Sequence, residues 1–187
     1  MNRIALALLA AVSAFSFAGQ ADAQTASGTV NVNGTVSARC SAVTPISGTI
    51  ALGELAKADG TVDSAFSSAA SGLTRSFTVL CNGANPQFSV NAKALVNAAA
   101  TNSPTGYTNT VHYTASVAAN LAKGGATTVA DQSIASGATV GLLGDRLAVA
   151  TNNVTLTIGS GATTDTKAVL EAGTYTGSVD IVITPAA

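Results

Sequence analysis

The chain has 187 residues, of which 47% are hydrophobic and only 9% are charged, and its formal net charge is −1. This length suits one domain with a sizeable core, and the low charge removes the electrostatic attraction on which nucleic-acid binding depends. Much of the hydrophobic content is Ala and Val interleaved with Thr, Ser, Gly and Asn, which favours pleated sheet and tight turns over helix. We therefore expect an all-β protein that does not bind nucleic acid.

Residues 1–23 have the three parts of a secretory signal peptide. Arg3 is the only cation of a short n-region, an apolar run follows over residues 4–18, and Ala21-Asp22-Ala23 forms an A-x-A cleavage site. The apolar run is short for a membrane-spanning helix and is not followed by basic residues, which disfavours a membrane anchor. We predict cleavage before Gln24 and export of a soluble mature chain.

The segment from residue 26 to residue 40 alternates between an apolar and a polar face. Successive side chains of a strand point to opposite faces, so a period of two predicts extended structure. The apolar face consists of Ala26, Gly28, Val30, Val32, Gly34, Val36, Ala38 and Cys40. At about 15 residues the segment is longer than one average strand. The part near Cys40 can join its own sheet, while the part near Val30 and Val32 can add to a sheet of another copy. Packing of the whole face into its own domain, as an ordinary edge strand, is the alternative.

The same alternation predicts seven further strands, at residues 48–55, 73–81, 87–95, 110–117, 139–143, 147–158 and 174–184. Clusters of turn-forming residues lie at 81–86, 101–106 and 159–166. Two stretches rich in Ala and Ser, 63–70 and 95–100, are expected to be loops. Many short strands joined by turn-rich segments predict a sandwich or a barrel.

The two cysteines, Cys40 and Cys81, are predicted to pair, because export places them where disulfides persist. The bond would close a loop of about 42 residues and stabilise the fold by about 4 kcal/mol in the chain-entropy treatment. Two free buried thiols are the alternative. A zinc site is disfavoured because His112 is the only histidine, and these residues do not supply a set of four ligands.

The last predicted strand has an apolar face formed by Tyr175, Val179, Ile181 and Ile183, and Pro185 follows it. An immunoglobulin-like sandwich would follow its penultimate strand with another that closes the sheet. If the fold is of that type, we expect it to lack its last strand.

Catalytic and ligand-binding patterns are weak throughout the sequence. His112 is flanked by Val111 and Tyr113 in a predicted strand and has no neighbouring cysteine or carboxylate in sequence. The segment 59–63 has two aspartates but not the dense set of oxygen ligands that a cation loop needs. No tryptophan and only three tyrosines are present, which disfavours a carbohydrate-binding module or adhesin. We expect no enzymatic activity, no cofactor and no metal.

The order of these features along the mature chain resembles the subunits of archaic chaperone-usher pili, the Csu type grouped with the spore coat protein U domain. The resemblance lies in TASGTVNVNGTVSARC, SGTIALGEL, RSFTVLCNG, YTNTVHYTASV and GTYTGSVDIVIT. The ending ITPAA departs from the more usual apolar or aromatic finish. The resemblance implies an incomplete immunoglobulin-like β-sandwich of six strands at residues 35–187, preceded by a donor-strand extension at residues 24–34.

The resemblance also implies a mechanism of assembly. A periplasmic chaperone would fill the groove of each subunit, and an outer-membrane usher would exchange it for the N-terminal strand of the next subunit. The residues inserted into the neighbour would be Gly28, Val30, Val32, Gly34 and Val36. The expected product is a pilus, or fimbrium, at the cell surface that serves adhesion and biofilm formation. A self-complete, monomeric secreted coat or surface protein is the alternative.

Overall fold

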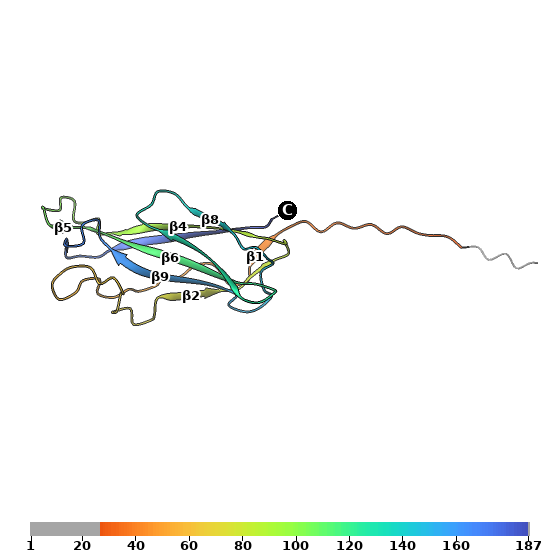
Figure 1. Ribbon diagram of the computed structural model, residues 1–187, viewed down its shortest axis with the longest axis horizontal. Helices are drawn as coiled ribbons and strands as arrows, with labels where there is room; N and C mark the ends of the chain where they lie inside the picture. The colour runs from red at the N-terminus through yellow and green to blue at the C-terminus, as the bar shows by residue number, and fades with distance from the viewer. Residues whose placement is uncertain (1–26, 187) are drawn as a thin grey trace, which may run out of the picture. The chain divides into compact units, whose positions relative to one another are not determined.

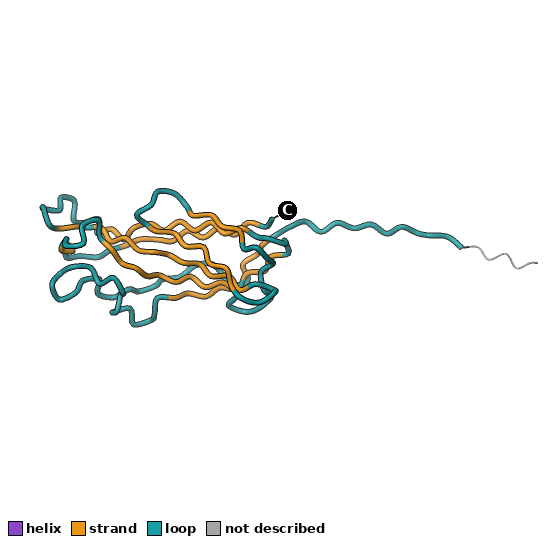
Figure 2. Tube along the Cα trace, viewed as in Figure 1, coloured by secondary structure: helices purple, strands orange, loops and turns teal. Residues whose placement is uncertain are grey.

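The computed structural model describes residues 27–186, and this part of the chain consists of strands and loops without a helix (Figure 2). Residues 36–186 form one compact unit, whereas residues 27–35 belong to another. The predicted signal peptide at residues 1–23 lies outside the described residues. The all-β class predicted from the composition is confirmed.

Eleven strands occur in the described residues. Their bounds are β1 (Cys40–Ala42), β2 (Thr74–Phe77), β3 (Val79–Cys81), β4 (Gln87–Val96), β5 (Tyr107–Thr108), β6 (Thr110–Asn120), β7 (Ala126–Gln132), β8 (Thr139–Leu142), β9 (Val154–Ala162), β10 (Val169–Leu170) and β11 (Thr176–Thr184).

Seven of these strands form one curled antiparallel sheet with the order β11-β4-β6-β9-β2. The sheet curls because β4 and β6 pair only over Leu95–Val96 and Thr110–Val111 and then diverge. Beyond that point β8 pairs with β4, and β7 pairs with β6. The result is two arms, β11-β4-β8 and β2-β9-β6-β7, which is consistent with a β-sandwich (Figure 1).

The core lies between the two arms and follows the period-two pattern of the long strands. In β4 the inward residues Phe88 and Val90 are fully buried, and in β6 Val111 and Val117 are as well. Short loops add Phe66, which is also buried. Because Ala and Val supply many inward positions, the two arms can approach closely at the cost of little side-chain entropy.

Two predicted strands are absent. Residues 27–39 lie in loop structure, and only Cys40–Ala42 forms β1. Alternation decides which side chains share a face, but a strand also needs a partner edge for its backbone groups. Residues 48–55 are loop as well, because Gly48 and Gly53 have φ angles of 130° and 73°, which interrupt an extended chain.

Other predicted bounds shift. The segment 73–81 divides at Thr78, so that β2 pairs with β9 whereas β3 pairs with β1. The strand predicted at 147–158 is wrong over its first half, because Asn152 has a φ of 54° and β9 begins only at Val154. The glycine-rich segment at 159–162 was expected to be a turn but belongs to β9, where a register shift opposite β6 and a φ of 54° at Ser160 mark a bulge.

Strand β7 was not predicted because a carboxylate occupies its inward face. Asp131 is 2% exposed and accepts hydrogen bonds from the Ala92 N–H at 2.8 Å and from Thr139 Oγ1 at 2.6 Å. It thereby satisfies a backbone group of β4, the strand that diverges from β6. A polar residue at an inward position breaks the pattern on which strand prediction depends.

Candidate functional site

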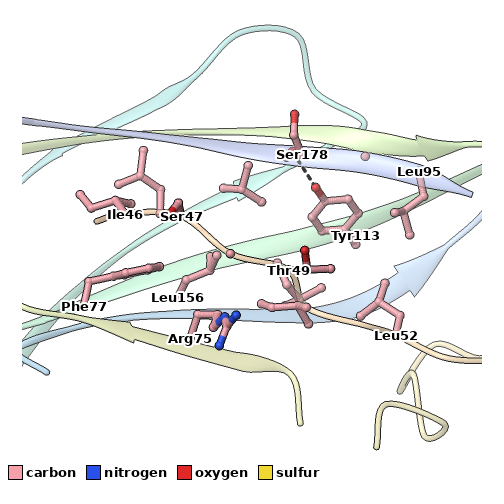
Figure 3. A pocket seen from close by; sticks show the side chains of 16 residues that line it. Ile46, Ser47, Thr49, Leu52, Arg75, Phe77, Leu95, Tyr113, Leu156 and Ser178 are labelled. Atoms are coloured by element: carbon pink, nitrogen blue, oxygen red, sulfur yellow. Dashed lines mark hydrogen bonds between the residues drawn. The ribbon is translucent and has the colours of Figure 1, made fainter. Parts of the chain in front are cut away.

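Strands β11 and β2 are the two ends of the curled sheet. Within the described range, β11 pairs only with β4, and β2 pairs only with β9. The loop of residues 46–52 runs between these two edges (Figure 3). It packs Ile46, Ile50 and Leu52 against the core, but its backbone forms no hydrogen bond with β11 or β2 there. Each edge therefore presents unpaired backbone groups toward the space beside this loop.

Two cavities lie along β11 on the side of this loop. The first has a volume of about 230 Å³ and the second about 710 Å³. They share five lining residues, Thr49, Ile50, Leu52, Leu95 and Gly177.

 Because these five residues line both cavities, the cavities form one continuous groove, which we call the β11 groove.

The apolar face of β11 is only partly covered. Val179, Ile181 and Ile183 are half-buried, whereas Phe88 and Val90 on the neighbouring strand β4 are completely buried. Val179 and Ile181 line the first cavity and Tyr175 lines the second, so the structure brings these three predicted residues of the C-terminal strand to the groove. Ile183 lies on the same face and packs at the edge of the core.

Tyr113 forms part of the groove wall and links β6 to the edge strand β11. Tyr113 is 5% exposed, and its hydroxyl donates a hydrogen bond to the Ser178 carbonyl at 2.8 Å (Figure 3). Burial raises the pKa of Tyr113 to about 12. Tyr113 was not among the predicted site residues, although its place on the apolar face of β6 is the signal that could have found it.

Two further residues fix the course of β11. The Tyr175 hydroxyl donates to the backbone carbonyls of Thr108 and Glu171, at 3.1 and 2.9 Å, and burial raises its pKa. Gly177 lies at a register shift against β4, where an added Cβ would be only 2.7 Å from the Lys93 carbonyl oxygen. A larger residue at position 177 would push β11 away from β4, so glycine permits the close approach there.

The alternating N-terminal segment exposes its apolar side chains. Val30 and Val32 are 86% and 91% exposed, and Val36 is 85% exposed. Gly28 and Gly34 are exposed too, and a Cβ added at either would meet no described atom within 4 Å. All five predicted donor residues are therefore accessible, which is unusual for three valines on one face of an alternating segment.

Cys40 and Cys81 form a disulfide, with an S–S distance of 2.03 Å, which confirms the predicted pairing. The two residues are direct partners in the antiparallel pair of β1 and β3. The bond anchors the start of the compact unit to the strand that precedes β4. A disulfide is typical of an oxidising compartment outside the cytoplasm.

The two aspartates of the segment 59–63 have hydrogen-bond partners, whereas one ring nitrogen of His112 has none. Asp59 accepts hydrogen bonds from Thr61 and Asp63 accepts from Ser67, and these bonds lower the pKa of each carboxyl group. His112 lies opposite Ala162 of β9, and its Nδ1 atom is buried without a hydrogen-bond partner.

Neither a metal site nor a membrane-spanning helix is found in residues 27–186. No three His, Cys, Asp or Glu side chains gather there as metal ligands would, and no helix of that part is long and apolar enough to cross a bilayer. In comparisons with known proteins, no family model, no curated protein and no solved structure matched the chain.

Proposed function

We propose that this protein is a structural subunit of an archaic chaperone-usher pilus and polymerises by donor-strand exchange. In this proposal the fold is an incomplete immunoglobulin-like sandwich, and the N-terminal segment of one copy fills the β11 groove of another. The observation that carries the proposal is the half-buried apolar face of β11 beside an open groove, in a chain that also exposes an alternating apolar segment.

The N-terminal segment and strand β11 agree in length, and the segment suits the apolar β11 groove in chemistry. Strand β11 has nine residues, and the predicted donor residues span the nine positions from Gly28 to Val36. No charged residue lies between these positions, so an inserted segment would bury no unpaired charge. Backbone hydrogen bonds to the unpaired edge of β11 would supply affinity, and the alternate side chains would supply specificity.

The expected gain from insertion is substantial. Full burial of a valine side chain contributes about 1.5 kcal/mol or more, so Val30, Val32 and Val36 together offer roughly 5 kcal/mol. Insertion would also cover Val179 and Ile181 on the subunit that accepts the strand. An unpaired edge beside an apolar groove favours aggregation, which gives a periplasmic chaperone and an outer-membrane usher their roles before assembly. The product would be a fibre at the cell surface that serves adhesion and biofilm formation.

A self-complete, monomeric coat or surface protein is the second candidate. It is favoured by the loop of residues 46–52, which already places Ile46, Ile50 and Leu52 against the core. In that case the loop would be the native cover of the core edge, and no strand from another copy would be needed.

A peptide-binding experiment distinguishes the two. A mature chain that lacks residues 24–33 is mixed with a peptide of residues 25–36, and thermal unfolding is measured. A ligand that binds only the folded state stabilises it by about 2.7 kcal/mol at 100 times its Kd, so the pilus proposal predicts a higher Tm. The matched control is the same peptide with Val32→Asp, which should leave Tm unchanged. A truncated chain that is stable, monomeric and indifferent to both peptides would support the self-complete protein instead.

A further inference from the structure

The sequence contains two Asn-Gly dipeptides, Asn33-Gly34 and Asn82-Gly83. In such a pair the backbone nitrogen of glycine can attack the side-chain carbonyl carbon of asparagine. The new C–N bond closes a succinimide ring and the side-chain nitrogen leaves as ammonia. Water then opens the ring at either carbonyl and produces aspartate or isoaspartate. Glycine favours the attack because it has no side chain to obstruct its nitrogen.

The two dipeptides differ in their surroundings. Both polar atoms of the Asn82 side chain form hydrogen bonds. Its Oδ1 accepts from the Arg39 N–H at 2.7 Å, and its Nδ2 donates to the Ser37 carbonyl at 2.9 Å. Gly83 is buried, and an added Cβ would lie 2.9 Å from the Ala186 carbonyl oxygen. The rotation that brings the Gly83 nitrogen onto the Asn82 side chain would break these contacts.

Asn33 has no such restraint. It is exposed, it lies in a loop segment, and its side chain forms no hydrogen bond with any other described residue. A Cβ added at Gly34 would meet nothing described within 4 Å. Neither contacts nor crowding there oppose the rotation that ring closure requires.

We infer that Asn33 is a site of spontaneous deamidation, whereas Asn82 is protected by the fold. Asn31 provides a natural reference in the same exposed segment, because it is followed by Val32, whose branched side chain obstructs the backbone nitrogen. The comparison of Asn33 with Asn31 isolates the effect of the following residue. The comparison of Asn33 with Asn82 isolates the effect of the fold.

The consequence for assembly rests on the proposed function. Isoaspartate routes the main chain through the former side chain and so adds one carbon atom between residues 33 and 34. The period of two is then interrupted, and Val30 and Val32 no longer share a face with Gly34 and Val36. The new carboxylate adds a charge beside the apolar groove. Deamidation at Asn33 therefore prevents aged, unassembled subunits from acting as strand donors. A segment already inserted in a neighbour is protected from deamidation, because its backbone is held in a sheet.

The modification is tested on the mature chain without any assembly. The folded protein is kept in warm, mildly alkaline buffer, and peptides are mapped over time by mass spectrometry with fragmentation that separates aspartate from isoaspartate. We expect conversion at Asn33 at least several-fold faster than at Asn31 or Asn82. After reduction and unfolding in denaturant, the rate at Asn82 should approach that at Asn33. Equal rates at Asn33 and Asn31, or at Asn33 and Asn82 in the folded chain, would overturn the assignment.

The effect on assembly is tested separately by ageing wild type beside Asn33→Gln, whose longer side chain closes the ring less readily. Aged wild type should lose self-association in proportion to its isoaspartate content, while aged Asn33→Gln should keep it. Equal loss in both proteins would overturn the role in assembly. If neither protein self-associates even when fresh, the proposed function and this role both fail, but the deamidation rates still decide whether Asn33 is a modification site.

Discussion

Replacement of Tyr113 by Phe removes a single hydroxyl from the wall of the β11 groove. In the wild type this hydroxyl donates to the Ser178 carbonyl at 2.8 Å, and the residue is 5% exposed. Phenylalanine preserves the packing of the ring, so the expected loss is that of one hydrogen bond, about 1 kcal/mol in the free energy of unfolding. Because this bond joins β6 to the edge strand β11, its loss should also loosen the groove.

The same residue predicts a pH dependence. Burial raises the pKa of Tyr113 to about 12, above the value of about 10 of an unfolded tyrosine. Between these values the unfolded chain has lost the proton and the folded chain retains it. The contribution of Tyr113 to stability is therefore complete below pH ~10 and declines as the pH rises toward its folded pKa. Allowing for solvent screening beside an open groove, we expect a decline of about 1–2 kcal/mol.

Guanidinium unfolding of wild type and Tyr113→Phe, from neutral pH to strongly alkaline pH, measures both effects. The difference in stability between the two proteins should be about 1 kcal/mol at neutral pH and should shrink or reverse in alkali. Tyr175 and the other ionisable groups are present in both proteins and cancel in the difference. Tyr107→Phe is the matched control, because Tyr107 is 51% exposed. Equal stability at neutral pH together with parallel pH profiles would refute this account of Tyr113.

Two further predictions concern the framework around the groove. Reduction of Cys40–Cys81 should lower the free energy of unfolding by about 4 kcal/mol, and an unchanged guanidinium midpoint after complete reduction would contradict this. Asn153→Ala should cost about 3 kcal/mol or more, because the buried side chain accepts from the Val79 N–H at 2.9 Å and donates to the Val79 carbonyl at 2.7 Å. Asn102→Ala, at an exposed position, should change the unfolding midpoint little, and equal effects of the two substitutions would count against this role of Asn153.

The strands with one continuous apolar face were predictable from the sequence. Alternation predicted residues 87–95 where the structure has β4, and 174–184 where it has β11. It also predicted which side chains of β11 share a face. These features depend on neighbouring residues alone, because a strand with one buried face must alternate.

Features that depend on contacts between distant residues were not predictable in the same way. The positive φ angles of Gly48 and Gly53 interrupt an alternating segment, which is therefore a loop. The bulge at Ser160 allows β9 to continue through a segment that has the composition of a turn. Asp131 interrupts the apolar alternation of β7, because its carboxylate accepts a hydrogen bond from the backbone of β4, a strand distant in sequence. The groove arises in the same way, because it needs β11, the loop of residues 46–52 and Tyr113 to meet.

The central claim is that the N-terminal segment of one copy fills the β11 groove of another, and a pair of matched substitutions tests it most directly. Val32→Asp and Asn31→Asp add the same charge at adjacent, exposed positions on opposite faces of the segment. Self-association of the two mature chains is compared with that of wild type by light scattering. Val32→Asp should abolish assembly, because burial of an unpaired carboxylate in an apolar groove costs several kcal/mol, whereas Asn31→Asp should assemble nearly as wild type does. Normal assembly of Val32→Asp, or equal impairment of both variants, would contradict the account.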